Sequence, residues 1–120
     1  MKAIKISVGD NLHNRIEVVD IEDTEPHYKA FAKAIESDWI EYVRTSLPAP
    51  YCMIAGEEAK LTGQPPNILA SYLYGTHQHG DTVNGDVIIM KDVNTPDGIE
   101  TAGLEQDDVF RVLEFLMERL

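Results

Sequence analysis

The sequence contains a single cysteine, Cys52, so it cannot form an internal disulfide of the kind that stabilises small secreted domains. No apolar run approaches the roughly 18 residues that a membrane-spanning helix needs. The apolar part of the N-terminal segment ends at Gly9 and Asp10, before it reaches the length of a signal peptide. We therefore expect a cytoplasmic protein.

Basic residues are also scarce. The chain has 10 Lys and Arg against 21 Asp and Glu, which gives a formal net charge of −11. Binding to DNA or RNA phosphates needs basic surface, so direct nucleic-acid binding is disfavoured, as is binding to anionic membranes. The charge instead fits a basic protein partner, or imitation of nucleic acid.

The familiar catalytic motifs are missing as well. The sequence has no phosphate-binding glycine loop, no G-x-S-x-G and no H-E-x-x-H. Cys52 lies in an apolar segment without a nearby base, which favours a buried structural thiol over a nucleophile. Glu57 and Glu58 are adjacent and would point in opposite directions on a strand, so they do not form an acid–base pair. We expect neither enzymatic activity nor a cofactor.

The length of 120 residues and a hydrophobic content of 43% predict one globular domain over residues 1–120. Period-two alternation and β-rich runs predict five strands, at residues 2–8, 16–21, 39–46, 51–55 and 82–91. Capping residues and three- and four-residue apolar spacing predict three helices, at residues 24–37, 68–74 and 105–120. Residues 94–103 are predicted to be a polar loop.

The last predicted helix has the clearest apolar stripe, formed by Val109, Val112, Leu113, Leu116, Met117 and Leu120. The order of the elements favours an α+β fold with a mainly antiparallel sheet of about five strands, helices packed on one face, and a C-terminal amphipathic helix. A doubly wound parallel sheet would require a helix after nearly every strand. The strand at 82–91 is apolar on both faces at residues 87–90, so we expect it to be central.

Acidic residues are concentrated in two segments. Residues 16–25 carry five acids and no base, and residues 81–108 carry eight acids and only Lys91. Such runs can be solvated loops and strand edges, or they can form an acidic binding face. For a binding face, the predicted partner-binding residues are Glu17, Asp20, Glu22, Asp23 and Glu25, followed by Asp97, Glu100, Asp107 and Asp108.

A second candidate site, for a small ligand or nucleotide, lies between residues 67 and 81. Its predicted residues are Asn67, Tyr74, His77, His79 and Asp81. The two histidines and the aspartate could supply three metal ligands, but the chain has no second His or Cys pair near them in sequence. An exposed polar loop is therefore favoured, and no metal is predicted.

Several short motifs, in a distinctive order, resemble an uncharacterised domain family of small acidic proteins from phages and mobile elements. The pattern includes, in this order, G-G-Y-I-E, E-E-G-K-L, L-P-x-N-x-x-A and I-x-G-D-V. These segments appear here as Trp39-Ile40-Glu41-Tyr42-Val43, Glu57-Glu58-Ala59-Lys60-Leu61, Gln64-Pro65-Pro66-Asn67-Ile68-Leu69-Ala70 and Val83-Asn84-Gly85-Asp86-Val87-Ile88-Ile89. The resemblance implies a phage or mobile-element setting and no particular activity.

Two functional hypotheses follow. The first is a non-enzymatic interaction protein that acts on a host protein through its acidic surface, in one version as a DNA-mimic inhibitor of a restriction or defence system. The second is a small-ligand or nucleotide-binding module with its site near residues 67–81.

Overall fold

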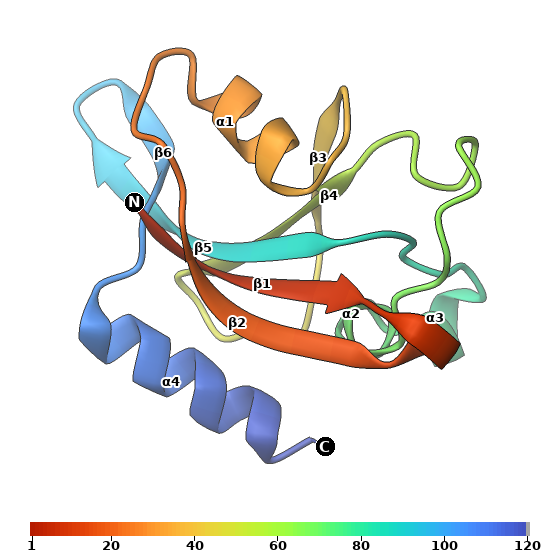
Figure 1. The fold of residues 1–120 in the computed structure, drawn as a ribbon. Coiled ribbons are helices and arrows are strands. Elements are labelled where there is room, and N and C mark those ends of the chain that lie inside the picture. Colours follow the sequence, from red (N-terminus) through yellow and green to blue (C-terminus); the bar gives the residue numbers. More distant parts are fainter. Residues whose placement is uncertain (120) are drawn as a thin grey trace.

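A computed structural model describes residues 1–119 of the chain. Strands and helices are interspersed along it (Figure 1). The strands are β1 (Lys2–Val8), β2 (Asn14–Asp20), β3 (Ile40–Val43), β4 (Tyr51–Gly56), β5 (Val87–Thr95) and β6 (Gly98–Ala102). The helices are η1 (Asp10–Leu12), α1 (His27–Ala34), α2 (Ile68–Tyr74), α3 (Thr76–His79) and α4 (Gln106–Met117). Leu120, predicted to belong to the apolar stripe of the last helix, lies outside the described residues.

All the strands form one antiparallel sheet with the order β2-β1-β5-β4-β3, and β6 pairs with the second half of β5. The predicted α+β class and antiparallel sheet are confirmed. The expectation that residues 87–90 lie in a central strand is confirmed too, because β5 pairs with β1, β4 and β6. The predicted bounds of the strand at 2–8 and of the helix at 68–74 agree with β1 and α2.

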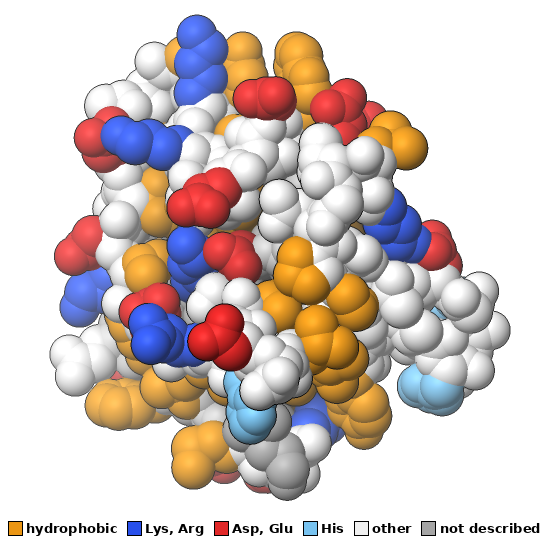
Figure 2. All heavy atoms as spheres, turned by 45° about the vertical axis from the view of Figure 1, so that its right-hand side comes forward, with side chains coloured by type: hydrophobic (Ala, Val, Ile, Leu, Met, Phe, Trp, Pro, Cys, Tyr) orange, Lys and Arg blue, Asp and Glu red, His pale blue; other side chains and the backbone are white. Residues whose placement is uncertain are grey.

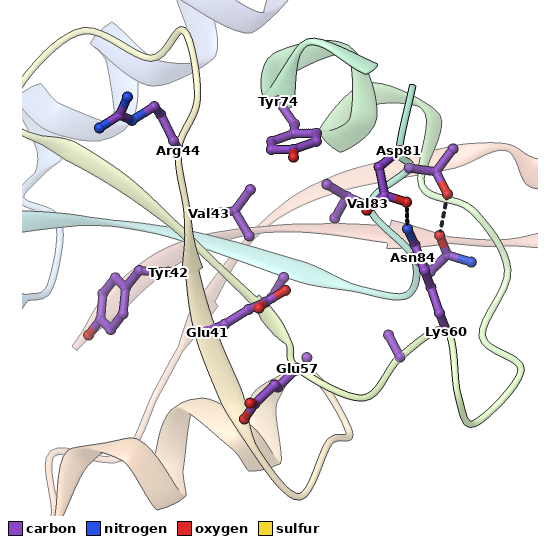
Figure 3. A pocket seen from close by; sticks show the side chains of 14 residues that line it. Glu41, Tyr42, Val43, Arg44, Glu57, Lys60, Tyr74, Asp81, Val83 and Asn84 are labelled. Atoms are coloured by element: carbon purple, nitrogen blue, oxygen red, sulfur yellow. Dashed lines mark hydrogen bonds and ion pairs between the residues drawn. The ribbon is translucent and has the colours of Figure 1, made fainter. Parts of the chain in front are cut away.

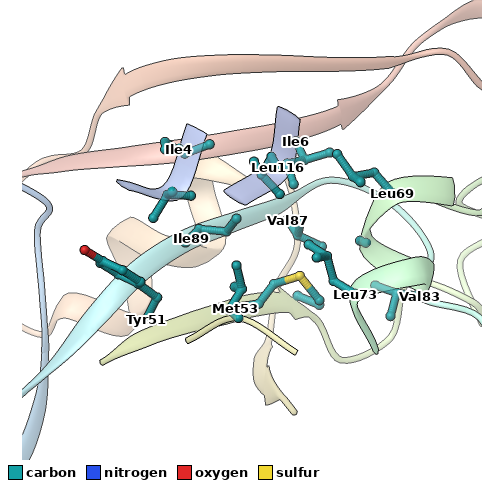
Figure 4. Close-up of a cluster of buried hydrophobic side chains, with 14 of the residues drawn as sticks. Ile4, Ile6, Tyr51, Met53, Leu69, Leu73, Val83, Val87, Ile89 and Leu116 are labelled. Carbon is teal, nitrogen blue, oxygen red and sulfur yellow. The ribbon is translucent and has the colours of Figure 1, made fainter. Parts of the chain in front are cut away.

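The sheet is covered on both faces, which corrects the expectation of helices on one face. Helix α1 packs on one face, in a core that contains Phe31, Ile54 and Ile88. Helices α2 and α4 pack on the other face, around side chains that include Met53 and Ile89 (Figure 4). Consecutive residues of a strand point to opposite faces, so the four apolar residues 87–90 of β5 need cover on both sides.

Strand β6 replaces the polar loop predicted at residues 94–103, so the sheet has six strands rather than five. Gly98 and Glu100 disfavour a strand while Ile99 and Thr101 favour one, and pairing with β5 holds the segment extended. The polar segment at 76–79 likewise forms the short helix α3 rather than an irregular loop.

Candidate functional site

The two acidic segments of the chain meet at the beginning of β1. The Ile21 N–H donates to the carbonyl of Met1 at 2.7 Å, and the Leu104 N–H donates to the carbonyl of Lys2 at 2.7 Å. The end of β2 and the connection from β6 to α4 therefore lie on either side of the N-terminus (Figure 1). Residues some eighty positions apart in the sequence are neighbours there.

Seven exposed carboxylates stand on this part of the molecule, which we call the acidic end. They are Asp20, Glu22, Asp23, Glu25, Glu100, Glu105 and Asp107. Two more of the predicted partner-binding acids lie apart from them. Glu17 is inside β2, three residues before Asp20 and on the opposite face of the sheet, and Asp97 is at the turn between β5 and β6. Glu17 and Asp20 also stand opposite Lys5 and Lys2 in the β1–β2 register.

Asp108 is buried and cannot contact a partner, so its place in the predicted binding set is corrected. Its carboxylate accepts hydrogen bonds from Lys91 Nζ at 2.7 Å, Tyr51 Oη at 2.9 Å and the Glu105 N–H at 2.9 Å. Burial alone would raise the pKa of Asp108, but these three donors hold that pKa at about 2. Asp108 completes a capping box with Glu105 and fixes the start of α4 against β5.

The residues of the second candidate site do not form one constellation. His77 and His79 line one groove, Asp81 pairs with Lys60 in a neighbouring cavity, and Tyr74 lines both. Among residues 1–119, no cluster of three or more His, Cys, Asp or Glu side chains could hold a metal ion. His77 and His79 instead lie against aromatic rings, as described below.

Asn67 is fully buried, and its amide is saturated by internal hydrogen bonds. Nδ2 donates to the carbonyls of Ile6 at 3.0 Å and Gly85 at 2.9 Å. Oδ1 accepts from the Ala70 N–H at 3.1 Å and from Asn14 Nδ2 at 2.9 Å. An asparagine amide offers two donors and two acceptor positions, so nothing remains for a ligand. Asn67 caps α2 and connects that helix to β1, β2 and the loop before β5.

The cavity that contains Asp81 lies between β3, the end of α2 and the loop before β5 (Figure 3). We call it the β3 cavity; its volume is about 360 Å³. Glu41 and Glu57 line it together with the Lys60–Asp81 pair. Partial desolvation, and then the nearby charge of Glu57, raise the pKa of Glu41. The cavity thus combines carboxylates with one paired lysine.

The groove next to it has a different lining. It runs between residues 44–46 and the α2–α3 segment, with Arg119 at its edge, and its volume is about 450 Å³. Tyr72 lies against His77 with ring centroids 6.3 Å apart, and Tyr74 lies against His79 at 5.0 Å. We call it the Tyr–His groove. Its lining as described within residues 1–119 contains no Asp or Glu.

Figure 2 views the molecule from the side on which α2 and α3 lie. Acidic and basic side chains alternate over the upper part of this face, whereas hydrophobic side chains gather lower down beside a histidine. The acidic side chains therefore do not form a continuous block on this side. The molecule separates an acidic end from a face with mixed charge and exposed aromatic surface.

Cys52 faces the α1 side of the sheet and is partly buried. Burial, and then the charge of Asp92 and a hydrogen bond to it, raise the pKa of the Cys52 thiol to about 12. A thiol with such a pKa stays protonated near neutral pH and is a poor nucleophile, as the sequence predicts.

These features define an α+β domain with a six-stranded antiparallel sheet and helices on both faces. Residues 1–116 match the family described as Domain of unknown function (DUF3846), so the chain belongs to that family. No curated protein and no solved structure matches it. No helix within residues 1–119 is long and apolar enough to cross a membrane.

Proposed function

We propose that this protein is a non-enzymatic interaction protein whose acidic end binds a basic surface on a host protein. The observation that carries the proposal is the meeting of two acidic segments at the start of β1, where seven carboxylates are exposed. Like charges gathered on one surface oppose folding through mutual repulsion, and a cationic partner removes that cost when it binds.

The partner we propose is a nucleic-acid-binding or defence protein in the cytoplasm of a host, met by a phage or another mobile element. The setting rests on the order of motifs that the chain shares with small phage and mobile-element proteins. A protein that binds DNA has a basic groove, and exposed carboxylates can occupy it in place of phosphates. The protein would then act as a DNA mimic that inhibits a restriction or defence enzyme.

The test is a pair of variants that remove five charges each. In the first, Asp20, Glu22, Asp23, Glu25 and Glu100 of the acidic end become Gln or Asn; in the second, the exposed Glu36, Asp38, Glu57, Glu58 and Glu114 do. Each variant keeps a net charge of −6, which is −11 with five negative charges removed. Affinity purification from the host should recover a basic protein with the wild type and the second variant, and lose it with the first.

The salt dependence supplies a second criterion. Binding through exposed charges weakens as salt screens them, over a Debye length of about 10 Å at 0.1 M. The proposal requires that the recovered partner dissociate from the wild type as salt rises, and that duplex DNA compete with it. Equal recovery by both variants at low salt would rule the proposal out.

A further inference from the structure

The Tyr–His groove differs in charge from the other hollows of this acidic protein. Four other hollows formed by residues 1–119 are each lined by at least two Asp or Glu residues. The Tyr–His groove, in contrast, has Arg44 and Arg119 in its lining and no carboxylate among its described residues. An anion that enters it meets guanidinium donors, one of which, on Arg119, also pairs with Glu118 outside the lining.

The two arginines are placed from different elements. Arg44 follows the end of β3, lines the groove with its side chain directed away from Tyr74 in Figure 3, and forms no ion pair within residues 1–119. Arg119 donates from Nη1 to the Phe115 carbonyl at 2.9 Å, and its guanidinium lies 3.4 Å from the centroid of the Phe115 ring. Glu118 is 3.6 Å from Arg119 but does not line the groove. A guanidinium offers five N–H donors in a fork that matches phosphate oxygens.

The same groove presents flat aromatic surface. Tyr72 is 52% exposed, so its ring is open to a ligand. The planes of Tyr72 and His77 are 29° apart, so these rings are stacked, and those of Tyr74 and His79 are tilted by 37°; each pair places two aromatic rings beside the groove. Rings of this kind stack on nucleobases without reading their sequence.

The walls of the groove are held in place by the backbone. The Ser46 N–H donates to the Leu73 carbonyl at 2.9 Å, which fixes residues 44–46 against α2. Gly75 ends α2 in the left-handed conformation at φ 92°, and its N–H donates to the Ser71 carbonyl at 3.0 Å. The turn at Gly75 places His77 and His79 back beside Tyr72 and Tyr74, so the groove is formed without a ligand.

From this geometry we propose that the Tyr–His groove binds a mononucleotide, with the base against the tyrosine and histidine rings and the phosphate at Arg44 and Arg119. The volume of about 450 Å³ lies within the range of about 300–1,000 Å³ typical of small-molecule sites. This site is separate from the acidic end, and its test does not depend on a protein partner. A free nucleotide fits better than a nucleic-acid strand, because the net charge of −11 repels a polyanion more strongly than a single phosphate.

Calorimetric titration of the wild-type protein with AMP, adenosine and ribose 5-phosphate tests the proposal. AMP should bind with one-to-one stoichiometry, and each fragment at least about tenfold more weakly, because each keeps only half of the contacts. Arg44→Ala and Tyr74→Leu should each weaken AMP binding by about tenfold or more. Arg15→Ala and Tyr28→Leu remove exposed side chains of the same types on β2 and α1, and should leave it unchanged.

Circular dichroism of each variant establishes that it is folded before its titration is interpreted. Absence of AMP binding at millimolar concentration, or equal weakening by the groove and control variants, would overturn the proposal. A ten-residue oligonucleotide provides the remaining comparison. If it binds more tightly than AMP and loses affinity in Arg44→Ala, the groove is a nucleic-acid site and the mononucleotide proposal is wrong.

Discussion

The acidic end and the Tyr–His groove are built in different ways. Most carboxylates of the acidic end stand on strand ends and connections, and they are solvent-exposed. The groove takes its shape from α2, from a left-handed glycine and from a hydrogen bond across its walls. An exposed surface such as the acidic end can adapt to a large partner, whereas a groove with fixed walls suits a small ligand of defined shape. The predictions below begin with the largest effect.

The α2 wall of the Tyr–His groove depends on Asn67, so Asn67→Ala should be the most destabilising of the single substitutions. It leaves the Ile6 and Gly85 carbonyls and the Ala70 N–H without their partner in a buried position. We expect a loss of about 4 kcal/mol in the free energy of unfolding, measured in urea. Asn94→Ala, at an exposed position of β5, should change it by less than about 0.5 kcal/mol. Similar values for the two variants would show that Asn67 is not the connecting residue described above.

Asp108 stabilises the fold, whereas the exposed carboxylates of the acidic end are accessible to a partner. Asp108→Asn should lower the free energy of unfolding by about 2 kcal/mol at pH 7, since the pKa falls from 3.8 to about 2 on folding. A depressed pKa stabilises the fold above the unfolded value and loses this effect as the pH falls through about 2. The difference between wild type and variant should therefore shrink below about pH 4.

Asp107, the exposed neighbour of Asp108, provides the control for this substitution. Asp107→Asn should leave stability within about 0.5 kcal/mol of the wild type over the same pH range. A pH-independent difference for Asp108→Asn would contradict the role of its charge.

Gly75→Ala tests the turn that shapes the groove. A non-glycine residue at φ 92° is strained, and the free energy of unfolding should fall by about 1 kcal/mol. Gly9, at φ −103°, has only the His13 carbonyl within 4 Å of an added Cβ, so Gly9→Ala should be nearly neutral. Thermal unfolding of the two variants measures the difference, and a Gly75→Ala variant as stable as Gly9→Ala would refute it.

The smallest effect concerns the acidic end itself. Neutralising Glu22, Glu100 and Asp107 should stabilise the fold by about 0.5 kcal/mol at low salt, because it removes mutual repulsion. The gain should vanish in 1 M salt, where charges are screened within about 3 Å. A loss of stability at low salt would mean that these acids make internal contacts that hold the fold.

The regular elements could be predicted because their signals are local. The alternation in β1 and the Asn67 and Gly75 caps of α2 mark those elements within a few residues. Strand β6 could not be predicted, since Pro96, Asp97 and Gly98 favour a turn or loop, and pairing with β5 holds the following residues extended. The placement of helices on both faces likewise depends on how distant segments pack.

For the candidate sites, the sequence identifies charged residues but not their surroundings. Asp108 stands among other acids, yet it lies four residues before Val112 and eight before Leu116, on the buried stripe of α4. That spacing is a signal of its burial. The groove has no such signal, because Arg44 and Arg119 are 75 positions apart and meet His77 and His79 only in the folded chain.

The central claim, that two separate surfaces serve two kinds of ligand, is tested most directly by amide chemical shifts in NMR spectra of the ¹⁵N-labelled protein. A decalysine peptide should shift residues 20–25 and 100–107, and AMP should shift residues 44–46 and 72–79. The account predicts two sets without overlap, and saturation with one ligand should leave the shifts induced by the other unchanged. A single shared set, or peptide-induced shifts centred on Glu36, Asp38, Glu57 and Glu58, would contradict it.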